Sequence, residues 1–76
     1  MKDLKFVWEF FGSDSEHLAK HHLNHLKEFL IKEKIIFSKI GVSKESLNFS
    51  CSFVVLDSSF LEIIKSSLKP HKAFKV

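Results

Sequence analysis

Apolar and polar positions alternate through residues 4–11, which is the pattern of a β-strand with one strongly apolar side. That side is formed by Leu4, Phe6, Trp8 and Phe10. Gly12 ends the alternation, and from residue 16 to about 34 the apolar positions recur every three or four residues, as in an amphipathic helix. Ser13 and Glu16 have the spacing of a capping box, so we predict that they begin this helix.

The rest of the chain alternates again and contains one more helical stretch. In order, the pattern predicts strands at 36–42 and 47–55 around a turn at 43–46, a helix at 59–68 and a closing strand at 71–76. We expect the inward side of the third strand to consist of Leu47, Phe49, Cys51, Phe53 and Val55. Ser59 and Glu62 repeat the capping-box spacing, and Pro70 stops the second helix.

This order of strands and helices resembles the split βαβ, or ferredoxin-like, arrangement. We therefore expect one α+β domain over residues 1–76, with a four-stranded antiparallel sheet and both helices on one of its faces. A chain of 76 residues is long enough for one domain and too short for two. The fold serves many functions, so the resemblance implies none by itself.

Composition narrows the classes of partner. All twelve positively charged residues are lysines, and arginine, the preferred side chain for phosphate and guanine edges, is missing. Nucleic acid is therefore a disfavoured partner despite the net charge of +3, and the third strand lacks the signature of an RNA-binding sheet. Lys5 and Glu9 interrupt the N-terminal apolar residues, so we expect no export signal, no membrane association and a cytoplasmic protein. Cys51 has no partner for a disulfide and suits that reducing compartment.

Four of the five histidines lie within nine residues of the first predicted helix. His17, His21 and His25 follow one another at four-residue intervals, so they share one side of the helix. We expect the first and third strands to run parallel, which would gather five side chains at one rim of the sheet. These candidate metal ligands are Asp14, His17, His21, Asp57 and His71. Imidazole ligands favour Zn, Ni or Cu. The alternative is a histidine ladder on a solvated helix flank without any ligand.

His22 is rotated away from this ladder, toward the apolar side of the helix. One interpretation is a partly buried histidine bonded to a backbone group. The other is a general base in a pocket between sheet and helix, in a small enzyme of the dimeric α+β barrel type. Cys51 is in phase with Phe49 and Phe53, so we expect it to point into the core and to be unreactive.

The sheet face without helices is the last candidate. With the third strand oriented as above, this face presents Val7, Phe11, Phe37, Val54 and Leu56. An uncovered antiparallel sheet is normally polar outside, so these residues predict a partner surface. Our main hypothesis is therefore a module that binds a partner or small ligand and forms a homodimer through this face. A transition-metal protein and a small enzyme are the alternatives.

Overall fold

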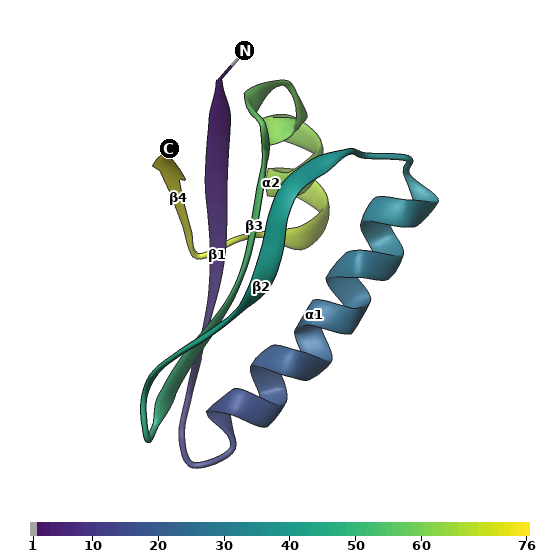
Figure 1. Ribbon diagram of the computed structural model, residues 1–76. Coiled ribbons are helices and arrows are strands. Elements are labelled where there is room, and N and C mark those ends of the chain that lie inside the picture. Colours follow the sequence, from purple (N-terminus) through teal and green to yellow (C-terminus); the bar gives the residue numbers. More distant parts are fainter. Residues whose placement is uncertain (1) are drawn as a thin grey trace.

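An antiparallel sheet forms one layer of the protein and two helices form the other (Figure 1). The computed structural model describes residues 2–76. Its elements are β1 (Asp3–Phe11), α1 (Ser15–Lys32), β2 (Phe37–Ser46), β3 (Phe49–Asp57), the short 3-10 helix η1 (Ser58–Phe60), α2 (Leu61–Leu68) and β4 (Lys72–Lys75). The strands lie in the order β2-β3-β1-β4. The predicted α+β class, four-stranded antiparallel sheet and two helices are confirmed. No helix within residues 2–76 has the length and apolarity needed to cross a membrane.

The two central strands run in opposite directions, so the prediction that they are parallel is wrong. β1 pairs with β3 from Asp3 opposite Asp57 to Phe11 opposite Phe49. The cause is the path of the chain, because α1 returns along the sheet and β2 then runs in the direction of β1. The β2–β3 hairpin reverses the chain once more. The end of β3 therefore lies beside the start of β1.

The hairpin turn lies later in the chain than predicted. Residues 43–46, expected to form the turn, belong to β2, and the chain reverses at Leu47 and Asn48 instead. The Gly12 amide donates a hydrogen bond to the Asn48 carbonyl at 2.8 Å, which ties the turn to the end of β1. Leu47 is 83% exposed and does not contribute to the core.

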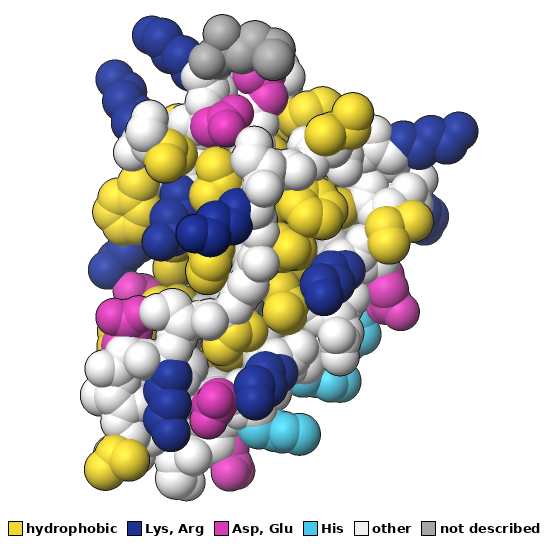
Figure 2. Space-filling model, viewed as in Figure 1, with side chains coloured by type: hydrophobic (Ala, Val, Ile, Leu, Met, Phe, Trp, Pro, Cys, Tyr) yellow, Lys and Arg dark blue, Asp and Glu magenta, His cyan; other side chains and the backbone are white. Residues whose placement is uncertain are grey.

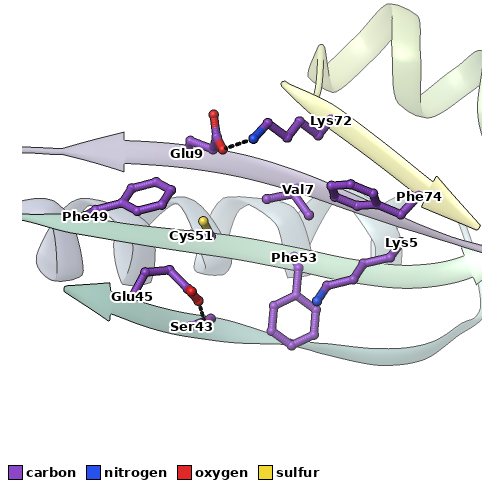
Figure 3. Close-up of a pocket in the computed structure, with 10 residues that line it drawn as sticks. All are labelled: Lys5, Val7, Glu9, Ser43, Glu45, Phe49, Cys51, Phe53, Lys72 and Phe74. Atoms are coloured by element: carbon purple, nitrogen blue, oxygen red, sulfur yellow. Dashed lines mark hydrogen bonds and ion pairs between the residues drawn. The ribbon is translucent and has the colours of Figure 1, made fainter. Parts of the chain in front are cut away.

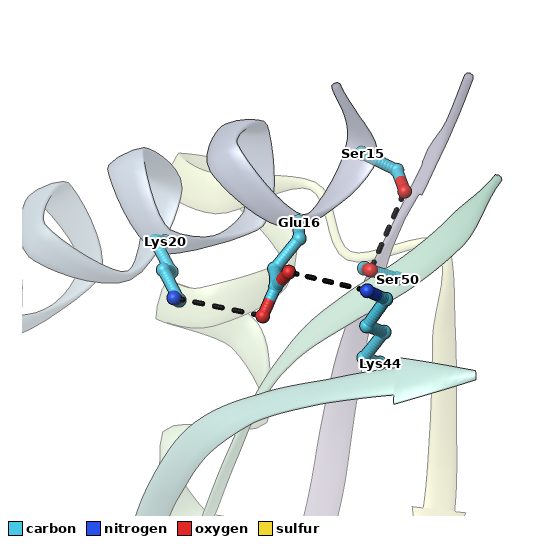
Figure 4. Close-up of polar contacts among 5 residues, drawn as sticks. All are labelled: Ser15, Glu16, Lys20, Lys44 and Ser50. Atoms are coloured by element: carbon cyan, nitrogen blue, oxygen red, sulfur yellow. Dashed lines mark hydrogen bonds and ion pairs between the residues drawn. The ribbon is translucent and has the colours of Figure 1, made fainter. Parts of the chain in front are cut away.

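Neither predicted capping box forms. α1 begins at Ser15 after Asp14, which makes no side-chain capping bond. Glu16 instead contacts Lys20 and Lys44, each at 3.5 Å, and so links the helix to β2 (Figure 4). At the second helical segment the cap is Asp57, whose carboxylate accepts a hydrogen bond from the Ser59 amide at 3.0 Å.

The core lies between the helices and one face of the sheet. Its buried residues are Phe6, Trp8, Leu26, Leu30, Ile35, Val54, Leu56 and Ile64. Both helices contribute to this set, so both cover the same face (Figure 1). The Trp8 indole N–H also donates to the carbonyl of Leu68 at 2.8 Å, which joins β1 to the end of α2.

The core face of β3 is the opposite of the predicted one. Val54 and Leu56, assigned above to the open face, are fully buried under the helices, and Phe37 packs partly buried against them. Ser50 and Ser52 share this face and are also fully buried. Serines fit here because the start of α1 approaches the sheet closely through its own small buried residues, Ser15 and Ala19. The hydroxyls of Ser15 and Ser50 are 3.4 Å apart (Figure 4).

β4 is the shortest strand and covers one edge of β1. It pairs from Leu4 opposite Lys75 to Val7 opposite Lys72, and all four of its residues are exposed. Lys69 precedes it in the left-handed backbone region, with φ of 47°, and ends α2. Pro70 follows directly, as expected for a residue that stops a helix.

Candidate functional site

The sheet face opposite the helices carries a cluster of aromatic, aliphatic and charged side chains, which we call the open face. It surrounds a hollow of about 220 Å³ (Figure 3). The hollow is lined by Lys5, Val7, Glu9, Ser43, Glu45, Phe49, Cys51, Phe53, Lys72 and Phe74. All four strands contribute, and α1 lies behind the sheet in this view. The face is thus assembled by the whole sheet rather than by one segment.

The floor of the open face is apolar and shielded from solvent. Val7, Cys51 and Val55 are only 7–8% exposed although no helix covers them. The ring of Phe49 stacks on Phe11, with their centroids 4.8 Å apart and their planes within 5°. Phe11 itself is 67% exposed, so the stack presents a large apolar edge to solvent.

Charged side chains frame this apolar floor. The Lys5 ammonium lies 4.7 Å from the centre of the Phe53 ring, in a cation–π contact. Lys72 forms an ion pair with Glu9 at 2.9 Å, and the hydrogen bond and charge of Glu9 raise the pKa of Lys72. Glu45 accepts a hydrogen bond from the Ser43 hydroxyl (Figure 3). These contacts hold the lysine and glutamate side chains along the rim of the hollow.

A glycine allows the Phe53 ring to lie flat across β2. Gly41 is the register partner of Phe53. A Cβ at position 41 would come within 3.2 Å of the Phe53 ring. Because that separation is tighter than ordinary carbon contacts, a larger residue would force the ring to move. The glycine thus sets the position of the ring above the sheet.

Only two of the five residues predicted for this face belong to it. Val7 and Phe11 do, whereas Phe37, Val54 and Leu56 face the helices. The residues that were missed are Phe49, Phe53, Val55 and Phe74. The sequence signal for this face is the pair of small residues Ser15 and Ala19 at the start of α1. A helix that approaches the sheet so closely needs small residues beneath it, which places the serines of β3 under the helix and its phenylalanines on the open face.

Cys51 is buried as expected, but beneath the open face rather than in the core. Its side chain lines the hollow together with Phe49 and Phe53. Burial, followed by the nearby charges of Glu45 and Glu9, raises the pKa of the Cys51 thiol. A raised pKa lowers the fraction of reactive thiolate at neutral pH. The prediction of an unreactive thiol is therefore consistent with its surroundings.

His22 leans toward the core, as predicted. Its Nδ1 lies 2.8 Å from the Ser52 hydroxyl, so the partner is a side chain and not the backbone group we expected. The ring lies 5.0 Å from Trp8 and 5.5 Å from Phe10, between centroids. Burial lowers the pKa of His22, and the charges of His25 and His71 lower it further.

The surroundings of His22 do not favour the enzyme hypothesis. A Ser–His pair can act as nucleophile and base only where a substrate reaches the hydroxyl. Ser52 is fully buried, and two aromatic rings pack against the imidazole. The hollow of Figure 3 lies on the other side of the sheet. The hydrogen bond and the ring contacts therefore act as structural links between α1 and the sheet.

The five predicted metal ligands do not converge. Asp57 caps η1 and lies opposite Asp3, at the far end of β1 from Asp14. His71 accepts a hydrogen bond at Nδ1 from the Glu9 amide at 2.7 Å and so extends the pairing of β1 with β4. Within residues 2–76, no three His, Cys, Asp or Glu side chains are grouped so that they could enclose an ion. The antiparallel course of β3 is the reason that Asp57 is displaced.

Two histidines of the helical ladder do meet. The exposed side chains of His21 and His25 place their Nε2 atoms 3.1 Å apart. Glu28 lies on the other side of the second ring, with its carboxylate 3.7 Å from His25 Nδ1. Histidine side chains gather over α1 in the space-filling view (Figure 2).

Comparison of the chain with protein-family models, with curated proteins and with solved structures gave no match.

Proposed function

We propose that the protein is a small binding module whose partner is a second copy of the same chain, docked on the open face. The observation that supports this is exposed aromatic surface on a sheet face that no helix covers, where Phe11 is 67% and Phe74 49% exposed. Antiparallel sheets with one solvated face normally carry polar residues there. Contiguous apolar surface of this kind, rimmed by charges, is typical of interaction sites.

Charge distribution supports a second copy as the occupant. Lys5 and Lys39 both lie opposite Val55 in the strand register, so these two lysines lie together toward one end of the open face. Glu45 lies toward the other end of the hollow, as does Glu9, which is paired with Lys72. A two-fold axis in the interface and perpendicular to the strands reverses their direction, which places Lys5 and Lys39 of one copy toward Glu45 of the other.

The order of elements and strands supports a ferredoxin-like fold for this module. Such a sheet leaves one face free for a partner, because both crossover helices lie on the other face. Cys51 is a single free thiol, which suits a cytoplasmic location. These features agree with a dimeric binding protein and do not require a catalytic centre.

The test is the molar mass in solution, measured by size-exclusion chromatography with light scattering. We expect a dimer for the unaltered chain and a folded monomer for Phe53→Lys. Ile31→Lys is the matched control, since Ile31 is a 74% exposed apolar residue of α1, outside the open face. Circular dichroism verifies that each variant is folded. A monomer at about 1 mM protein, well above a Kd in the micromolar range, would overturn the proposal.

Charge exchange tests the orientation of the two copies. Lys39→Glu and Glu45→Lys should each weaken the dimer, because each places like charges across the interface. The double variant should recover dimerisation. A dimer that is insensitive to both single changes, yet is lost in Phe53→Lys, would retain the open face as the interface and reject this two-fold arrangement.

A further inference from the structure

We propose that His21 and His25 form a two-histidine site for a divalent transition metal ion on the exposed side of α1. Their Nε2 atoms are 3.1 Å apart, and the two ring centroids are 4.7 Å apart. The four-residue spacing places both imidazoles on one side of the helix. The site differs from the predicted rim, because it uses neither His71 nor either aspartate.

The separation of the two nitrogens suits a shared ion. Zinc binds imidazole nitrogen at about 2.0–2.1 Å, so two nitrogens at a tetrahedral angle lie about 3.3–3.4 Å apart. The observed 3.1 Å is close to that value. The rings of His21 and His25 are exposed, so solvent leaves them room to rotate and direct both lone pairs at one point. The helix therefore brings the two ligands together before any ion is bound.

Glu28 supports the same assignment. Its carboxylate lies 3.7 Å from Nδ1 of His25, on the opposite side of the ring from Nε2. Metal-bound histidines commonly donate their second N–H to a carboxylate, which fixes the tautomer and the orientation of the ring. With the proton of His25 on Nδ1, its Nε2 is free to bind the ion. Without metal, the Nε2–H of His21 then donates a hydrogen bond to Nε2 of His25. When a metal ion binds Nε2 of His21, the proton of that ring is carried on Nδ1 instead.

The number of protein ligands identifies the class of ion. Two imidazoles leave the remaining coordination positions to water, since no third ligand is grouped with them within residues 2–76. Such a site favours ions that bind nitrogen strongly, in the order Cu²⁺ above Ni²⁺ and Zn²⁺, and discriminates against Mg²⁺ and Ca²⁺. We therefore expect an exchangeable, partly hydrated ion.

This inference is independent of the proposed dimer. α1 and the open face lie on opposite sides of the sheet (Figures 1 and 3). Copies joined through the open face would carry one histidine pair each, on their outer surfaces. Metal binding should therefore persist in the monomeric Phe53→Lys variant, and loss of metal binding should leave the dimer intact.

Isothermal titration of the purified chain with Cu²⁺, Ni²⁺ and Zn²⁺ at pH 7.5 tests the site. We expect one saturable ion per chain and at least tenfold weaker binding in His21→Asn and in His25→Asn. Glu28→Gln should weaken binding by about tenfold, as found for other carboxylates behind metal-bound histidines. His17→Asn is the matched control, because His17 is an exposed histidine of the same helix that is not a proposed ligand. This variant should change the affinity by less than about twofold, as is usual for a surface substitution away from a site.

Histidine NMR resonances supply a second measurement that does not depend on heat. Zinc should shift the ring signals of His21 and His25 at substoichiometric amounts, and those of His17 should follow only at excess metal. Equal losses of affinity in the His17→Asn and His21→Asn variants would overturn the proposal. Weak shifts of similar size at every exposed histidine would also overturn it.

Discussion

The Nδ1 atom of His22 and the hydroxyl of Ser52 lie 2.8 Å apart, at the place where the first helix meets the buried face of the central sheet. Ser52 is fully buried, so this contact supplies a hydrogen-bond partner to a hydroxyl that water does not reach. Trp8 and Phe10 lie against the same imidazole. A titratable ring therefore takes part in the packing of the helix.

The burial of this imidazole makes the stability of the fold depend on pH. The pKa of folded His22 is lowered from its ordinary value of 6.5, so below that pH the unfolded chain binds a proton more readily than the folded one. The contribution of His22 is complete above pH 6.5 and is lost as the pH falls through the lower folded pKa. Urea unfolding between pH 8 and 5 should show this loss, and His22→Gln should reduce it. His17→Gln is the exposed control, and an equal reduction there would refute the assignment.

Two leucines distinguish the observed core face from the predicted one. Leu56 is fully buried, whereas Leu47 is 83% exposed. Leu56→Ala should therefore lower the free energy of unfolding by about 2–5 kcal/mol. Leu47→Ala should change it by no more than about 0.5 kcal/mol. Chemical denaturation measures both, and similar losses in the two variants would contradict the orientation of β3.

Ser50 tests whether size or polarity matters under the start of α1. Ser50→Ala keeps a small side chain and should cost no more than about 1 kcal/mol. Ser50→Leu places extra volume beneath Ser15 and Ala19 and should cost about 1–3 kcal/mol or more. Ser46→Leu, at an exposed position of β2, is the control for the same change in side chain. If Ser50→Leu were as stable as that control, the close approach of the helix would be wrong.

The end of α2 offers a stabilising change. Lys69 has φ of 47°, in a backbone region where any side chain with a Cβ is strained. Lys69→Gly should raise the free energy of unfolding by about 0.5–1 kcal/mol, because relief of strain exceeds the extra entropy of the unfolded glycine. Lys65→Gly, inside the helix, should lower it by about 1 kcal/mol. Thermal and urea unfolding of the two variants provide the comparison.

Periodicity was sufficient for the elements of this chain but not for their ends. The change from alternation to a helical period located both helices and all four strands. The capping-box spacings at Ser13 and Ser59 were misleading, because Asp14 and Asp57 occupy the positions before the helical segments. A spacing of three residues between serine and glutamate recurs easily in a chain rich in both, so local sequence alone does not identify the cap.

The orientation of β3 could not be predicted from its own residues. Both of its faces are rich in apolar side chains, and the larger ones, Phe49 and Phe53, lie on the face away from the helices. Burial of the serines depends on how closely α1 approaches, which is a property of tertiary packing. Because the two faces of β3 were exchanged in the prediction, Val54 and Leu56 were assigned to the open face, although both are buried under the helices.

The sequence predicted that an apolar open face exists, but not which residues of β3 form it. An apolar open face and the inclination of His22 followed from the pattern, whereas the convergence of Asp57 with Asp14 depended on a parallel pair of strands that does not exist. The meeting of His21 with His25 followed from helical spacing, but the role of Glu28 needed the side-chain positions.

The short strand β4 determines whether one edge of β1 is open to pairing with another molecule. β4 shields one edge of β1 with four exposed residues, so local opening of this end requires the loss of few contacts. Its departure would leave the amide and carbonyl groups of β1 available to a strand from another molecule. While β4 is in place, it is itself the edge strand of the sheet. The charges of Lys72 and Lys75 on β4 disfavour pairing of this edge with a strand from another molecule. β4 therefore keeps this edge of β1 paired and closed to a strand from another molecule.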